Sequence, residues 1–236
     1  MCTLTYIPVS GGYIFTHNRD ERQDRPSTRE IIREKNGDQT LYFPRDLEAS
    51  GTWIAHSDRG ISACILNGGS IPHQRKAAYR KSRGLVVLES FGYQNPLHFK
   101  DQYNFQDIEP FTLILHHPEG LFKLIHNENS TSLETLDDRK THIWSSTTLY
   151  TREVREKRKK WFDSWLKKDP ELSPENITRF HMSAGDGDQE NDLIMSRWGI
   201  LKTVSLTQVA SSEGGVQMTY KDFVHNSEDR VHLPLK

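Results

Sequence analysis

Cys2 is the residue of this chain best placed to act as a nucleophile, because removal of Met1 would make it the first residue. Methionine is generally removed when the second residue is small. The exposed α-amine, with a reference pKa of about 8, can then accept the proton of the Cys2 thiol. One residue would supply nucleophile and base. Cysteine at position two is often incidental, so this interpretation depends on what surrounds it.

A run of mostly polar and ionisable residues, 17–22, follows the second apolar segment of the chain. A glycine turn at 11–12 predicts a hairpin that pairs segment 3–9 with segment 13–17 and brings this run beside Cys2. A carboxylate there can accept hydrogen bonds from an ammonium group, and an arginine can stabilise a thiolate. The alternative is a charged strand end that enters a solvated loop.

Strand geometry divides this run between two faces. Side chains alternate along a strand, so we expect His17, Arg19 and Glu21 on one face. Asn18 and Asp20 are expected on the other face, unless a bulge intervenes. These five side chains are the candidates for contact with the nucleophile or with a substrate.

A third polar feature closes the apolar segment 61–66, where Asn67 is followed by Gly68 and Gly69. The Asn67 amide can donate a hydrogen bond to a developing oxyanion, and the glycines permit close approach of the backbone. The alternative is an ordinary Asn-Gly turn.

The elements that would position these residues are mainly hairpins. Turn sequences join short apolar segments at residues 10–12, 36–37, 58–60, 118–120 and 214–215. Hairpins of this kind predict antiparallel sheets rather than a doubly wound parallel sheet.

Three helices are predicted between the strands. One is capped by Ser82, one extends from about residue 148 to 166, and one follows Ser173 and Pro174. The order of strands and helices favours helices that cover the outer faces of two packed antiparallel sheets. We therefore expect an α+β fold in a single domain over residues 1–236.

Composition excludes several classes of function. The chain has 31 Lys and Arg against 32 Asp and Glu, a net charge of -1, and lacks the basic surface that nucleic acids or anionic membranes require. No apolar run approaches the ~20 residues of a membrane-spanning helix, and the N-terminus lacks a secretion signal, which predicts a cytoplasmic protein. Cys2 and Cys64 are expected to be free thiols, with Cys64 buried.

Two charged segments are predicted to have no ligand-binding role. Segment 184–192 is acidic but does not fit the spacing of a calcium-binding EF-hand, so we expect a solvated loop and no metal site. The basic run 155–160 is predicted to be the solvent-facing side of a helix whose core side carries the aromatic residues of 161–165. His181 either lines a pocket or is a packed or surface histidine.

The order of these features resembles the NRDE family, which includes the relatives of transport and Golgi organisation protein 2. The opening MCTLTY is followed by Asn18-Arg19-Asp20-Glu21, the tetrapeptide from which the family takes its name. Segment 51–55, GTWIA, is similar to the next block of that family. The sequence motifs match in the N-terminal part of the chain. In the rest, only the expected order of strands and helices is similar.

A more distant similarity is to N-terminal-nucleophile (Ntn) cysteine amidases of the bile salt hydrolase and penicillin V acylase type. Their strand Phe-Gly-Arg-Asn-x-Asp aligns with residues 15–20, and their oxyanion-hole strand with residues 60–67. This similarity implies a four-layer αββα sandwich with Cys2 as nucleophile. It also implies Asp20 as the partner of the α-amine and Asn67 as oxyanion donor.

Two positions depart from the amidase pattern. The amidase arginine falls on His17, with Arg19 two positions later on the same predicted face. The second amidase asparagine falls near residues 145–147, where Ser146 is the candidate substitute. The sequence shows no clear counterpart of the distal catalytic arginine of the amidases.

Two functions are consistent with these features. The first is an Ntn hydrolase that cleaves a linear, non-peptide amide through Cys2, with Arg19, Asp20 and Asn67 in the catalytic group. The residues expected to contact substrate are His17, Asn18, Glu21, Ser146 and His181. This reaction needs no cofactor; the partner would be a small molecule, and homo-oligomers are common among the resembled amidases. The second function is that of a non-catalytic binding or trafficking protein that retains the scaffold.

Overall fold

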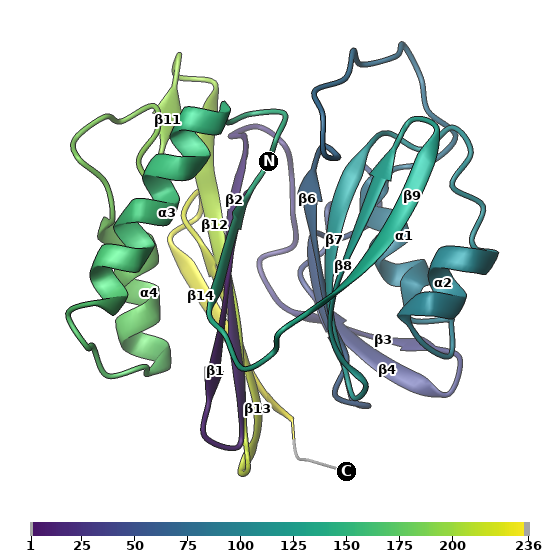
Figure 1. The fold of residues 1–236 in the computed structure, drawn as a ribbon, viewed down its shortest axis with the longest axis horizontal. Helices are drawn as coiled ribbons and strands as arrows, with labels where there is room; N and C mark the ends of the chain where they lie inside the picture. Colours follow the sequence, from purple (N-terminus) through teal and green to yellow (C-terminus); the bar gives the residue numbers. More distant parts are fainter. Residues whose placement is uncertain (1, 234–236) are drawn as a thin grey trace. The chain divides into compact units, whose positions relative to one another are not determined.

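The computed structural model describes residues 2–233, which form two compact units. The first unit combines residues 2–25 with residues 139–233, and the second comprises residues 26–138. Each unit contains its own antiparallel sheet and its own helices (Figure 1). The predicted α+β class, with two antiparallel sheets and covering helices, is confirmed. The expected single domain stays a prediction.

The sheet of the first unit has the strand order β10-β1-β2-β12-β13-β14, with β11 paired to β12. Its strands are β1 (Cys2–Val9), β2 (Gly12–Arg22), β10 (His142–Ser145), β11 (Ser196–Arg197), β12 (Leu201–Ser212), β13 (Gly215–Asp222) and β14 (Ser227–Leu233). The helices α3 (Arg152–Leu166) and α4 (Pro174–Ser183) lie on one face of this sheet (Figure 1). The core between helices and sheet is formed by Ile7, Ile14, Phe162, Ile177, Phe180 and Leu193.

The hairpin between β1 and β2 sets the register on which the rest of the unit depends. Gly11 adopts a φ of 72°, a left-handed conformation that favours glycine. Gly12 lies so close to β12 that an added Cβ would come within 2.1 Å of the Ser211 carbonyl oxygen. The two strands then pair from Val9 opposite Gly12 down to Cys2 opposite Arg19.

The sheet of the second unit has the order β3-β4-β5-β6-β7-β8-β9, so each strand pairs with its neighbour in sequence. Its strands are β3 (Ile32–Asn36), β4 (Gln39–Phe43), β5 (Ile54–Ser57), β6 (Ser62–Asn67), β7 (Phe111–His117), β8 (Gly120–Asn127) and β9 (Ser130–Leu136). The helix α1 (Arg83–Ser90) packs against β5 and β6, and α2 (Pro96–Gln102) contacts β9. Cys64 forms no disulfide and is fully buried within β6, as predicted.

Turn and capping residues predicted most of these elements correctly. The hairpin turns at all five predicted places are present, Ser82 caps α1, and Ser173 caps α4. The long helix begins at Arg152 rather than near 148, because the Thr151 side chain caps it by accepting from the Val154 N–H.

Five short or polar elements were not predicted: α2, β9, β10, β11 and β14. Strands β9, β10 and β14 lie at sheet edges, and β9 and β14 have several exposed side chains, so they lack the apolar alternation that identifies a half-buried strand. Among residues 2–233, none of the helices is long and apolar enough to cross a membrane.

Candidate functional site

Cys2 begins β1 and is held there from both sides. Its residue pair on β2 is Arg19, and its carbonyl oxygen accepts a hydrogen bond of 2.9 Å from the backbone N–H of Ser146, just beyond β10. Cys2 is 3 % exposed, and Arg19 and Ser146 are also buried. The structure therefore brings together three of the predicted site residues.

Arg19, rather than Asp20 or Glu21, is the residue directly opposite Cys2. Residues opposite each other in an antiparallel pair project from the same face, so Cys2 and Arg19 share a face of the sheet. His17 lies two positions before Arg19 and shares that face as well. We call it the thiol face.

Asn18 lies on the other face, toward the helices. Its side-chain amide donates to the carbonyl oxygens of His181 (3.1 Å) and Leu193 (2.8 Å). The His181 ring lies 3.0 Å from Asn18 Oδ1 through Nδ1, and 2.8 Å from Thr5 Oγ1 through Nε2. All of these side chains are fully buried, so Asn18 and His181 join α4 to the β1–β2 hairpin, away from the thiol face.

Asp20 also lies on the helix side and is fully buried. One carboxylate oxygen accepts from the Tyr150 hydroxyl and the other from the Thr203 hydroxyl, both at 2.6 Å. Burial raises the pKa of Asp20, and the charge of Arg158 with these two hydrogen bonds acts in the opposite direction. Tyr150 and Thr203, from two distant parts of the chain, thus hold the Asp20 carboxylate in one orientation.

Arg158 corrects the prediction that the basic run 155–160 faces solvent, because its side chain is completely buried. The guanidinium stacks 3.7 Å from the centre of the Tyr150 ring, donates to the Thr3 hydroxyl, and donates to the carbonyl oxygens of Asn191 (3.1 Å) and Asp192 (2.7 Å). The signal was present in the sequence. Residue 158 precedes Phe162 by four positions and so lies on the apolar face of α3.

Burial and charge set the ionisation of the thiol face. Burial raises the pKa of the Cys2 thiol, and the positive charge of Arg19 lowers it in part. Burial likewise holds the pKa of His17 well below its usual value, with Arg19 acting in the same direction, so the imidazole is neutral near pH 7. The thiol is mainly protonated in this environment, and a base is required to ionise it.

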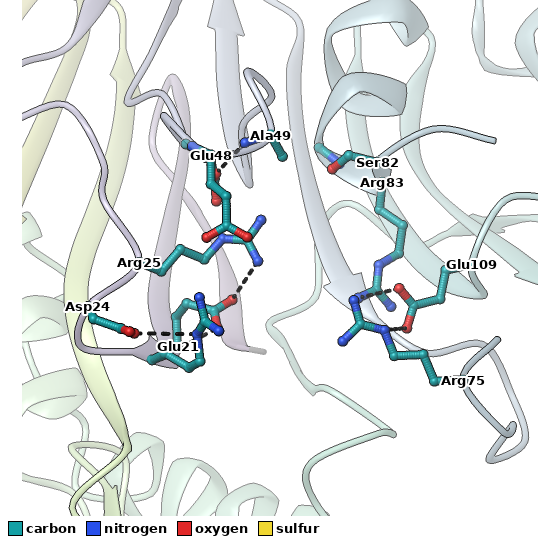
Figure 2. Close-up of polar contacts among 12 residues, drawn as sticks. Glu21, Asp24, Arg25, Glu48, Ala49, Arg75, Ser82, Arg83 and Glu109 are labelled. Atoms are coloured by element: carbon teal, nitrogen blue, oxygen red, sulfur yellow. Dashed lines mark hydrogen bonds and ion pairs between the residues drawn. The ribbon is translucent and has the colours of Figure 1, made fainter. Parts of the chain in front are cut away.

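Glu21, at the end of β2, is tied to its own loop. Its carboxylate accepts from the Arg22 backbone N–H at 2.9 Å and pairs with Arg25 at 3.9 Å, as Figure 2 shows for Arg25. Burial alone would raise the pKa of Glu21, but the Arg22 hydrogen bond and the charges of Arg19 and Arg25 lower it. Glu21 is therefore a carboxylate near neutral pH.

Asn67 is the last residue of β6 in the second unit, opposite Phe111. Gly68 follows with a φ of 93° and donates its N–H to the Pro110 carbonyl oxygen at 2.9 Å. This turn requires glycine, as the sequence indicated. Asn67 stays a predicted oxyanion donor.

An ion cluster that the sequence did not reveal lies at the start of α1. Glu109 pairs with Arg83 at 3.1 Å and lies 3.9 Å from Arg75, as Figure 2 shows, and it is 3.5 Å from the His73 ring. Arg83 is the first residue of α1. The cluster joins residues 73 and 75, before α1, and the first residue of α1 to residue 109, which precedes β7.

The acidic segment 184–192 folds around one of its own carboxylates. Asp192 accepts from the backbone N–H groups of Asp186 (2.9 Å) and Gly187 (3.2 Å), and Lys157 pairs with Asp186 at 2.6 Å. Within residues 2–233, no group of three or more His, Cys, Asp or Glu side chains could hold a metal ion.

Comparison with known proteins identifies the family of the chain. The model of the family Transport and Golgi organisation 2 matches residues 1–211. The chain belongs to this family. No curated protein sequence matches it significantly.

Solved structures similar to this family member include two variants of a conjugated bile acid hydrolase. A cysteine-to-alanine variant of conjugated bile acid hydrolase from Clostridium perfringens has a TM-score of 0.59 at 9% identity, over 99% of this chain and 92% of the other. An arginine-to-leucine variant of the same enzyme has a TM-score of 0.62 at 9% identity, over 98% and 92%.

A third similar structure is an N-acylethanolamine-hydrolyzing acid amidase ortholog from Caenorhabditis elegans. It has a TM-score of 0.51 at 12% identity, over 88% of this chain and 92% of the other. At these identities the likeness establishes a common Ntn-hydrolase fold, which confirms the predicted resemblance.

Proposed function

We propose that this chain is an N-terminal-nucleophile hydrolase that cleaves a linear, non-peptide amide through Cys2 after removal of Met1. The observation that carries the proposal is the placement of Cys2, a buried thiol at the first position of a strand that is paired on both sides, directly opposite an arginine. A conjugated bile acid hydrolase and an N-acylethanolamine-hydrolyzing acid amidase ortholog share the fold. Met1 itself lies outside the described residues.

The reaction begins with the thiol proton. The α-amine of Cys2 accepts it, and the thiolate attacks the amide carbonyl carbon. Asn67 and backbone N–H groups are the proposed donors to the resulting oxyanion. The α-ammonium group then protonates the leaving amine as the C–N bond breaks, and water hydrolyses the thioester to release the acid.

Each remaining site residue has a proposed role that follows from its position. Arg19 favours the thiolate by its charge, and Ser146 holds the Cys2 backbone. His17 and Glu21, on the predicted face of Cys2, are the proposed substrate contacts.

The helix-side residues have proposed roles in orientation. Asp20 would attract the α-ammonium group by its negative charge, as the similarity to the amidases implies. Asn18 and His181 would support the hairpin from behind. The reaction needs neither cofactor nor metal and requires a free thiol, so we propose a reducing compartment, the cytoplasm.

The first test is the intact mass of the purified chain before and after treatment with iodoacetamide. We expect a mass without Met1 and faster modification of Cys2 than of Cys64, the other buried thiol. Retention of Met1, or modification of Cys2 no faster than of Cys64, would contradict the mechanism.

The second test places one alanine before Cys2, so that the thiol remains and its α-amine is lost. Hydrolysis of conjugated bile acids and N-acylethanolamines, followed by mass spectrometry, should fall about 100-fold or more, because the base is removed. Cys2→Ala should abolish hydrolysis, and Cys64→Ala is the matched control that should retain it. If Cys2→Ala kept the biological role of the protein, the non-catalytic binding alternative would be correct.

A further inference from the structure

Three buried polar atoms on the thiol face have no hydrogen-bond partner on another of the described residues. They are Nδ1 and Nε2 of His17 and the hydroxyl oxygen of Ser205. His17 is fully buried and Ser205 is 1 % exposed. Leaving such a group unsatisfied costs about 1–3 kcal/mol, so their concentration in one place indicates a binding function.

The strand register places these atoms beside Cys2. Strand β2 lies between β1 and β12, with Arg19 opposite Cys2 on one side and opposite Ser205 on the other. Cys2, Arg19 and Ser205 therefore form one row across three strands. His17 is two positions along β2, diagonal to both Cys2 and Ser205. Diagonal neighbours on one face are about 7–8 Å apart, close enough for one small molecule to contact both.

The chemistry of the two side chains defines what they can bind. A neutral imidazole has one donor and one acceptor nitrogen, and a serine hydroxyl both donates and accepts. Burial and the charge of Arg19 keep His17 neutral. A carboxylate only accepts, so it would leave the acceptor nitrogen of His17 facing another acceptor. A hydroxyl group satisfies both.

We propose that His17 and Ser205 form a subsite that binds a hydroxyl group on the acyl part of the substrate, a few bonds from the carbonyl that Cys2 attacks. This inference rests on the proposed function and adds a substrate class to it, the hydroxyacyl amides. The subsite would discriminate against the deoxy analogue, because the buried polar atoms would then lack partners.

The test uses two para-nitrophenyl esters, of butyric acid and of β-hydroxybutyric acid, which differ by one hydroxyl group. The rate of Cys2 acylation is measured from released nitrophenolate and from the mass of the acylated chain. The wild-type protein should prefer the hydroxyacyl ester by about tenfold or more. The preference should fall to about one in His17→Leu and by about threefold in Ser205→Ala, and His17→Gln, which keeps a donor and an acceptor, should restore part of it.

Thr16→Val is the matched control. Thr16 is the neighbour of His17 on the helix side, where it accepts from Gln208, so its loss should leave the preference unchanged. Acylation of Cys2 at equal rates by both esters would overturn the subsite while leaving the proposed function intact. A preference retained in both His17→Leu and Ser205→Ala would also overturn it. Absence of Cys2 acylation by either ester would overturn the proposed function and the subsite together.

Discussion

Two opposing effects act on the pKa of the Cys2 thiol. Burial disfavours the charged thiolate, and Arg19, its partner across the strand pair, favours it. In the proposed mechanism the α-amine removes the thiol proton, and the positive charge of Arg19 would stabilise the thiolate that forms.

Replacing Arg19 by methionine should therefore raise the pKa of Cys2 further. The pH at which iodoacetamide modifies Cys2 at half its maximal rate should move upward by about one unit, since a nearby opposite charge shifts a pKa by about 1–3 units. Arg22→Met is the control, because Arg22 is at the exposed end of β2 beside Asp24. An unchanged profile in Arg19→Met would show that Arg19 does not act on the thiol.

Helix α3 packs against the β1–β2 hairpin on the face of the sheet opposite Cys2. Arg158 projects from its apolar face into the core, contacts Thr3 of β1, and stacks on Tyr150, whose hydroxyl donates to Asp20 of β2. One side chain thus connects the helix to both strands of the hairpin that carries Cys2. Its charge balances that of the buried Asp20.

The Arg158→Met variant should lose about 3–5 kcal/mol of unfolding free energy, because it leaves a buried carboxylate without its compensating charge. Adding Asp20→Asn should recover part of this loss, with a coupling energy of about 1–3 kcal/mol in a double-mutant cycle measured by urea unfolding. Lys159→Met, on the exposed side of α3, should change stability by less than about 0.5 kcal/mol. Additive effects of the two buried substitutions would contradict the linkage.

Both units contain a buried neutral histidine, which makes acid sensitivity a property of the whole molecule. Burial, with the charge of Arg158, lowers the pKa of His181 to about 3, and burial, with the charge of His116, lowers that of His56 to about 4. Their unfolded value is 6.5, so the unfolded chain binds more protons below that pH. The stability that depends on the neutral rings is fully present above pH 6.5. This contribution to stability is lost as the pH falls toward the pKa values of the two histidines in the folded chain.

Urea unfolding near pH 7.5 and near pH 5.5 should show a decrease of about 4 kcal/mol or more at the lower pH, because the fully buried His17 contributes as His56 and His181 do, each by about 1.4 kcal/mol. A His181→Gln variant should show a decrease smaller by about 1.4 kcal/mol, whatever its stability at neutral pH. If the chain is a single domain, as its sequence predicts, unfolding should remain one transition at both pH values. Equal stability at the two pH values would show that the buried rings do not govern acid sensitivity.

Local sequence was sufficient for the hairpins, the helix caps and the neighbours of Cys2. Glycine turns have few conformations, strands alternate faces, and serine or threonine before a helix satisfies its free N–H groups. From these rules alone, the run that contains Arg19 was expected beside Cys2 and Asp20 on the opposite face, and the structure has both features. The polar edge strands were not predicted, because an edge strand buries few side chains and so lacks a clear alternation of apolar residues.

Contacts between distant segments required the folded chain. The partners of Asp20 are Tyr150 and Thr203, far along the sequence, and no local pattern pairs them. Helical spacing from Phe162 places Arg158 on the apolar face of α3, but its partners, Thr3 and residues 191 and 192, are brought together only by packing. The identity of the nucleophile candidate is thus a local property of the N-terminus. Its charge environment is a property of packing, because burial and long-range hydrogen bonds determine which ionic forms are stable.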